Sequence, residues 1–225
     1  MWTLRLCVSL QGYRTSETML GGGRMKEFNI VLAGVGGQGI LLAAEILGTA
    51  AVKEGLNVRV GEIHGMAQRG GAIVSTVRIG ENVLSPMILE GKADVILGFE
   101  PLETLRNMGY ASEKTLIIMG DEKIPPPGLT LKGEDYPQKN EILEKIRRFS
   151  KNVIIVEALR LAKEAGNIIM QNTVLLGALA ATGKLPMAEV SLLEALKELV
   201  PAKYVEMNIK AFNLGYNHAK KLLEA

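Results

Sequence analysis

The amino-acid sequence predicts an α/β protein with a Rossmann-like, open and mostly parallel sheet, followed by a helical C-terminal section. Three observations predict this class. Residues 28–33 form an apolar run typical of a buried parallel strand, and a glycine-rich turn follows directly. Residues 40–53 are rich in Leu, Ala and Ile, which favours a helix after the turn. Short apolar runs then alternate with helical segments along the rest of the chain.

The turn has the sequence GVGGQG at residues 34–39. Between a strand and a helix, this G-x-G-x-x-G spacing can hold a nucleotide phosphate. The first glycine permits a tight turn, the second lets another group approach the backbone, and the third allows helix and strand to pack closely. We therefore expect a cofactor-binding turn made of Gly34, Gly36, Gly37, Gln38 and Gly39. A tight turn without a ligand is the alternative, because the motif is common.

The other elements follow from shorter patterns. Strands are expected at residues 58–62, 72–79, 94–99, 115–119 and 152–156, which contain β-branched residues typical of strands. Helices are expected at residues 101–108, 139–149, 158–165, 171–182 and 205–223. Ser191 and Glu194 fit a capping box that opens one more helix, ended by Pro201. Residues 121–137 contain three consecutive prolines and are expected to be a long loop that covers a site or contacts a partner.

Composition excludes several classes of function. The formal net charge is only +2 and aromatic residues make up 4% of the chain, so neither a basic field nor stacking platforms indicate nucleic acid as a partner. The apolar run at residues 173–181 is too short to cross a bilayer, so no membrane is expected as a partner. The chain contains one cysteine, Cys7, which agrees with a cytoplasmic location and cannot by itself ligate an iron–sulfur cluster. His64 and His218 lie far apart in sequence, so no metal site is expected.

Residues 25–225 are expected to form a single domain, and residues 1–24 do not resemble the rest of the chain. Arg5 interrupts the only apolar stretch of this leader, which argues against a secretory signal. Three glycines and Arg24 directly precede Met25, where the strand pattern begins. We expect residues 1–24 to be a non-native or disordered extension and Met25 to be the native start.

A second motif, HGMAQRGG, occupies residues 64–71, directly after the strand expected at 58–62. In a doubly wound sheet it would lie at the carboxyl edge, beside the first glycine turn. Arg69 offers donors suited to a carboxylate or phosphate, and the imidazole of His64 can titrate near neutrality. The catalytic residues are unknown; the candidates are His64, Gln68 and Arg69, with Gly70 and Gly71 as further cofactor-binding positions. The alternative is structural: the arginine binds loop carbonyls and the histidine is a satisfied turn residue.

The two motifs together resemble the gamma-type subunit of the 2-oxoacid:ferredoxin oxidoreductase family. The form HGMAQRGG is similar to that of members acting on indolepyruvate, whereas pyruvate and 2-oxoglutarate members usually carry a Tyr-Gly loop before Arg-Gly-Gly. Residues 205–212, VEMNIKAF, followed by Gly215 and Tyr216, also resemble the ending of that family. The resemblance covers residues 25 to about 223.

The resemblance implies an enzyme whose chemistry needs partners. Such enzymes oxidatively decarboxylate a 2-oxoacid to an acyl-CoA with thiamine diphosphate, and pass electrons through iron–sulfur clusters to ferredoxin. This chain has no Gly-Asp-Gly thiamine motif and no cysteine beyond Cys7. The resemblance therefore implies that this chain alone binds no cofactor, that a larger alpha subunit holds the thiamine and clusters, and that coenzyme A is a co-substrate of the complex. Gln68 and Arg69 would then position groups or bind an anion near the substrate or coenzyme A channel.

Two alternatives belong to other classes. One is an NAD(P)-dependent reductase, supported by the glycine motif and by Glu62 at about the place of a ribose-binding acid. The absence of a second substrate domain and of an obvious acid–base pair argues against it. The other is a non-catalytic scaffold subunit of the same complex, which contributes only interface area. The apolar helices and the proline-rich loop could equally provide such an interface.

Overall fold

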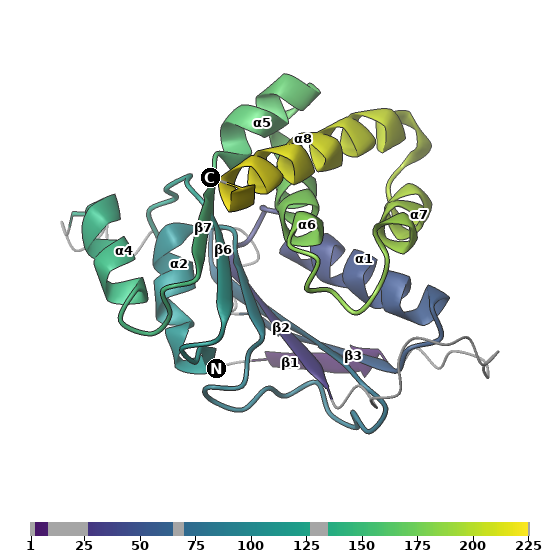
Figure 1. Ribbon diagram of the computed structural model, residues 1–225, viewed down its shortest axis with the longest axis horizontal. Coiled ribbons are helices and arrows are strands. Elements are labelled where there is room, and N and C mark those ends of the chain that lie inside the picture. Colours follow the sequence, from purple (N-terminus) through teal and green to yellow (C-terminus); the bar gives the residue numbers. More distant parts are fainter. Residues whose placement is uncertain (1–2, 9–26, 65–69, 127–134, 225) are drawn as a thin grey trace.

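The computed structural model describes residues 3–8, 27–64, 70–126 and 135–224, which form an α/β fold around one seven-stranded sheet (Figure 1). The strands are β1 (Thr3–Val8), β2 (Phe28–Val35), β3 (Val58–His64), β4 (Ala72–Ile79), β5 (Val95–Gly98), β6 (Leu116–Gly120) and β7 (Val153–Val156). Their order across the sheet is β1-β3-β4-β2-β5-β6-β7.

The sheet has a parallel half and an antiparallel half. β2, β5, β6 and β7 pair in parallel, whereas β1 with β3, β3 with β4, and β4 with β2 pair antiparallel. β3 therefore runs in the direction of β2, with β4 between them, and only β1 and β4 run the opposite way. The expected α/β class with a mostly parallel sheet is confirmed.

Helices cover both faces of the sheet (Figure 1). The helices are α1 (Ile40–Lys53), α2 (Pro101–Arg106), α4 (Lys139–Ile146), α5 (Ala158–Ala165), α6 (Gln171–Ala181), α7 (Glu189–Leu199) and α8 (Val205–Glu224). α2 and α4 lie on one face, and α1 packs with the C-terminal helices on the other. In the described part of the chain, no helix has both the length and the apolar character needed to span a membrane.

Strand β2 is apolar from Ile30 to Ala33 because both faces of the sheet are covered there. Successive side chains of a strand point to opposite faces. Ile30 and Leu32 join the core beneath α1 and the C-terminal helices, whereas Val31 joins the core beneath α2 and α4. Because both faces are covered, consecutive positions in the middle of the strand are apolar.

The C-terminal section is built on a close crossing of α6 and α8. A Cβ atom on Gly177 of α6 would lie 2.0 Å from the carbonyl oxygen of Phe212 on α8. A Cβ atom on Gly215 of α8 would lie 1.9 Å from the carbonyl oxygen of Val174 on α6. The two glycines therefore let the helix backbones approach each other directly.

The expected capping box before residue 200 is wrong. Helix α7 begins at Glu189, so Ser191 lies inside it. The cap comes from a distant residue: the Glu54 carboxylate, just after α1, accepts hydrogen bonds from the Ala188 N–H and the Ser191 hydroxyl, both at 2.6 Å. A tertiary contact thus replaces the local motif.

Helix ends also differ from the expected ones by a few residues. α2 stops at Arg106 and a short 3₁₀ turn follows, and α4 stops at Ile146. Within the leader, residues 3–8 form β1 against the outer edge of β3. The origin of residues 1–24 stays a prediction, which the mass of the native N-terminal peptide tests.

Candidate functional site

The glycine turn contacts the end of the second motif through the backbone. The Gly36 N–H donates to the Gly71 carbonyl at 2.9 Å, and the Gly70 N–H donates to the Gly36 carbonyl at 3.3 Å. The contact continues the β2–β4 ladder, in which Val35 pairs with Ala72. The two motifs therefore meet because β4 runs antiparallel beside β2, and not because β2 and β3 are neighbouring parallel strands.

The second motif is described only at its two ends. His64 is the last residue of β3, where its backbone pairs with Ile73. Gln68 and Arg69 lie outside the described residues. The roles expected for His64, Gln68 and Arg69 stay predictions.

Both polar atoms of the Gln38 side-chain amide form hydrogen bonds within the protein. Its Oε1 accepts from the Val35 N–H at 2.8 Å, and its Nε2 donates to the Phe99 carbonyl at 2.9 Å. The side chain thus ties the turn after β2 to the end of β5. A Cβ atom on Gly34 would lie 2.7 Å from both the Gln38 Oε1 and the Phe99 Cβ, so this glycine makes room for the same link.

Gly39 has a different neighbour from the one expected. It precedes α1 with φ of 75°, a left-handed conformation that favours glycine. A Cβ atom there would lie 2.6 Å from the Nδ2 of Asn172, a buried residue of α6. Gly39 therefore allows close packing against α6, not against strand β2.

A cavity of about 290 Å³ opens beside the glycine turn, and we call it the glycine-turn cavity. Its lining comes from the turn, the end of the second motif, the segment after β6, and the link between α5 and α6. The lining residues are Val35, Gly36, Gly37, Gln38, Gly70, Glu122, Ile124, Ile168, Ile169 and Gln171.

Glu122 is the ionisable residue of this lining. Its Oε2 is closed off from solvent and has no hydrogen-bond partner among the described residues. The wall beside it is fixed by Glu100, a buried carboxylate that accepts from the Ile124 N–H at 3.3 Å and from the Tyr136 hydroxyl. Burial and the Glu100 carboxylate raise the pKa of Tyr136, so its hydroxyl stays protonated and can donate.

Ile168, Ile169 and Gln171 were not expected at this site from the sequence, and Glu122 was expected only as part of the loop at residues 121–137. Glu122 follows closely after the carboxyl end of β6. Ligands of open α/β sheets bind at the carboxyl ends of strands, so this position could have indicated a site residue. The isoleucines carry no such signal, since they lie between two helices.

The geometry disfavours the NAD(P) alternative. Glu62 lies on β3, and β4 separates β3 from β2. With strands about 4.8 Å apart, Glu62 is displaced from β2 by about 10 Å across the sheet. The described lining of the glycine-turn cavity contains a carboxylate and neither lysine nor arginine, which is unfavourable for a pyrophosphate.

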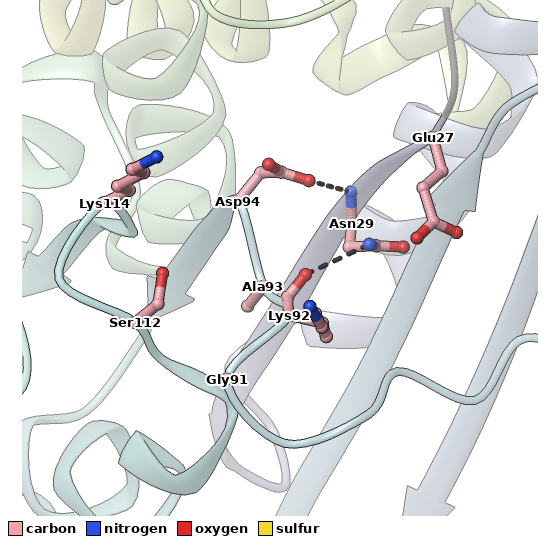
Figure 2. Close-up of a pocket in the computed structure, with 8 residues that line it drawn as sticks. All are labelled: Glu27, Asn29, Gly91, Lys92, Ala93, Asp94, Ser112 and Lys114. Carbon is pink, nitrogen blue, oxygen red and sulfur yellow. Dashed lines mark hydrogen bonds between the residues drawn. The ribbon is translucent and has the colours of Figure 1, made fainter.

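A second hollow, of about 220 Å³, lies at the opposite edge of the sheet (Figure 2). There the Asn29 N–H donates to Asp94 Oδ2 at 2.7 Å, and the Asn29 Nδ2 donates to the Lys92 carbonyl at 3.0 Å. Burial raises the pKa of Asp94, and the hydrogen bond from Asn29 opposes that shift. These groups bind one another and join the starts of β2 and β5, which is a structural role.

The described residues do not gather the ligands of an iron–sulfur cluster or another metal centre. Over the described ranges, no three or more His, Cys, Asp or Glu side chains gather as a metal site. Clusters of this kind need several thiolates, and the sequence has one cysteine.

Known proteins resemble this chain over most of its length. The family model described as "Pyruvate ferredoxin/flavodoxin oxidoreductase" matches residues 29–218. "Indolepyruvate oxidoreductase subunit IorB" of Pyrococcus horikoshii is 46% identical over 88% of this chain and 99% of the relative. "Pyruvate/ketoisovalerate oxidoreductases common subunit gamma" of Thermococcus kodakarensis is 30% identical over 82% of this chain and 92% of the relative.

Solved structures show the same fold. The gamma subunit of a keto/oxoacid ferredoxin oxidoreductase from Geobacter sulfurreducens has a TM-score of 0.62 at 24% identity, covering 88% of this chain and 99% of that one. A 2-oxoglutarate:ferredoxin oxidoreductase from Magnetococcus marinus has a TM-score of 0.65 at 22% identity, covering 89% of this chain and 32% of that one. The family match and these relatives show that the chain belongs to the pyruvate ferredoxin/flavodoxin oxidoreductase family, as a subunit of a 2-oxoacid:ferredoxin oxidoreductase.

Proposed function

We propose that this chain is the small subunit of an indolepyruvate:ferredoxin oxidoreductase and works only together with a larger alpha subunit. The observation that carries the proposal is the backbone contact between Gly36 and residues Gly70 and Gly71, which joins the two sequence motifs at one cavity. The resemblance of residues 64–71 to the indolepyruvate form and the 46% identity to an indolepyruvate oxidoreductase subunit support the substrate.

The proposed reaction is the oxidative decarboxylation of an arylpyruvate to an acyl-CoA with reduction of ferredoxin. Thiamine diphosphate and the iron–sulfur clusters belong to the alpha subunit, because this chain has neither a thiamine motif nor the cysteines for a cluster. Coenzyme A is a co-substrate of the complex, and ferredoxin is reached through the complex. A cytoplasmic location agrees with the single cysteine.

The chain's own contribution is to complete the assembly near the substrate or coenzyme A channel. The carboxyl edge of the sheet, with the glycine-turn cavity, faces the alpha subunit in this proposal. Gln38 fixes the turn through the Val35 N–H and the Phe99 carbonyl. Arg69 and Gln68 bind an anionic group or hold the loop in position, and they break no bond themselves.

Co-purification of the tagged chain from its native host tests the proposal. The expected result is a large partner that carries iron and thiamine diphosphate, with activity on indolepyruvate and coenzyme A. The partner assayed without this chain should be inactive, which separates a functional subunit from a scaffold. A lone chain that binds NADH would overturn the proposal.

A further inference from the structure

Three polar side chains are buried where α6 meets α1 and α8. Asn172 and Thr173 belong to the first turn of α6, and Asn208 belongs to the first turn of α8. Both asparagines are 3% exposed and the threonine is fully buried, although the rest of α6 after them is apolar. Buried polar groups add little net stability even when they are paired, because their burial removes hydrogen bonds to water. Their presence in this core therefore points to a role in geometry.

The hydroxyl of Thr173 links α6 to α8. It donates to Asn208 Oδ1 at 2.6 Å, and Asn208 Nδ2 donates to the carbonyl of Tyr204, in the turn before α8, at 3.0 Å. The hydroxyl oxygen also lies 3.5 Å from Asn172 Oδ1, but the shorter contact uses its single proton. Asn208 is the asparagine of the C-terminal motif VEMNIKAF, so this contact gives that motif a place in the fold.

The neighbouring Asn172 links α6 to the glycine turn. Its Nδ2 donates to the Gly39 carbonyl at 3.4 Å, and a Cβ atom on Gly39 would lie 2.6 Å from the same nitrogen. The same end of α6 forms one wall of the glycine-turn cavity, through Ile168, Ile169 and Gln171. α6 lies between α8 and α1 (Figure 1), so the position of its first turn decides where both this wall and the contact to Gly39 lie.

We propose that Thr173 and Asn208 are positioning residues, which hold the first turn of α6 at one rotation and distance relative to α8. This placement sets the contact of Asn172 with Gly39 and the α6 wall of the glycine-turn cavity. A hydrogen bond is directional, whereas apolar side chains can repack while the helices slide and rotate. The buried pair therefore selects one geometry and contributes little to stability. It acts through residues of this chain alone, whatever the chain's partner.

The test separates stability from geometry. Thr173→Val leaves Asn208 Oδ1 without its donor, and Asn208→Leu leaves the Thr173 hydroxyl without its acceptor. The double variant replaces both partners with apolar side chains of similar size. Thr182→Val is the matched control, because it makes the same change at the opposite end of α6, where the hydroxyl donates to the Leu179 carbonyl.

Thermal unfolding and amide hydrogen exchange are measured on the full chain. The exchange probes are the Gly36 N–H, which donates to the Gly71 carbonyl, and the Gln38 N–H, which donates to the Val35 carbonyl. Amides in the middle of β2, which is paired on both sides, report opening of the core for comparison.

Each single variant should melt at a lower temperature than the parent, since a buried polar group loses its partner. The double variant should melt close to the parent, because replacing both partners with apolar groups can be nearly neutral. Its Gly36 and Gln38 amides should nevertheless exchange roughly tenfold faster than in the parent, while exchange in β2 stays the same. Thr182→Val should leave the exchange of both probes at the parent rate.

A double variant that regains both the melting temperature and the slow exchange at the glycine turn would overturn the inference, because the pair would then contribute only stability. Single variants as stable as the parent would also overturn it, and so would a control that accelerates exchange as much as the double variant does. These measurements need no alpha subunit, so their failure leaves the proposed function standing.

If the double variant does not fold, Thr173→Ser and Thr173→Val decide. The serine keeps the hydroxyl, and its glycine-turn amides should exchange as slowly, relative to β2, as those of the parent. The valine variant should show faster exchange at the turn relative to β2. Equal ratios in the serine and valine variants would overturn the inference.

Discussion

The side chain of Gln38 joins the turn after β2 to the backbone of Phe99 at the end of β5, through a hydrogen bond of 2.9 Å. The same amide accepts from the Val35 N–H at 2.8 Å. One side chain thus fixes the glycine turn relative to the neighbouring parallel strand.

Gln38→Ala should lower the free energy of unfolding by about 1–3 kcal/mol, because two backbone groups lose their partner. Chemical denaturation of the isolated chain measures this change. Gln171→Ala is the matched control: Gln171 lines the same cavity, has no side-chain hydrogen bond recorded within the described residues, and should change stability little. Equal stability of the two variants would contradict the structural role of Gln38.

Gly215→Ala should lower the free energy of unfolding by about 2–4 kcal/mol, because the new methyl group would meet the Val174 carbonyl and push α8 away from α6. Thermal unfolding checks this. Gly109→Ala serves for comparison, since a Cβ atom there meets nothing within 4 Å. A Gly215 variant as stable as the Gly109 variant would show that the helices can separate without cost.

Arg69→Ala should reduce the turnover of the assembled enzyme, or its affinity for the alpha subunit, by roughly tenfold, because a positioning or anion-binding cation is lost. Steady-state assays of the complex with indolepyruvate measure both effects. Arg148→Ala, at an exposed position after α4, should leave them unchanged. Normal assembly and normal turnover of the Arg69 variant would exclude the proposed role.

Asp94→Asn should change how stability depends on pH. Burial is the largest cause that raises the pKa of Asp94, so the folded protein binds this proton more tightly than the unfolded chain does. The cost of the ionised form is therefore present at neutral pH, and it is relieved as pH falls through the folded pKa towards the ordinary aspartate pKa of 3.8. The asparagine variant avoids this cost, and its Oδ1 can still accept from the Asn29 N–H.

Thermal unfolding between pH 4 and 7 checks this expectation. At pH 7 the Asn variant should melt at a higher temperature than the parent, and the difference should shrink towards pH 4. Asp135→Asn, at an exposed position, should show no such trend. A lower melting temperature of the Asp94 variant at pH 7 would mean that the hydrogen bond from Asn29 outweighs the effect of burial.

The candidate site was only partly predictable. The sequence indicated the glycine turn, and the structure brings Gly36 to Gly70 and Gly71 as expected. It indicated Glu122 only as part of the loop at residues 121–137, and it did not indicate Ile168 or Ile169, because nothing local relates residues 168–169 to residue 36. Their proximity depends on the order of the strands and on the packing of α6.

The sequence by itself determined the class of the fold and the approximate positions of its strands and helices, because apolar period and helix-forming composition are local properties. It also determined the family, through two short motifs in register. Only the tertiary structure decided that β4 lies antiparallel between β2 and β3, that Glu54 caps α7, and that Glu122 lines the same cavity as the glycine turn. These relationships join residues far apart in the chain, and the free energy that selects them comes from packing, burial and hydrogen bonds that exist only once the chain has folded.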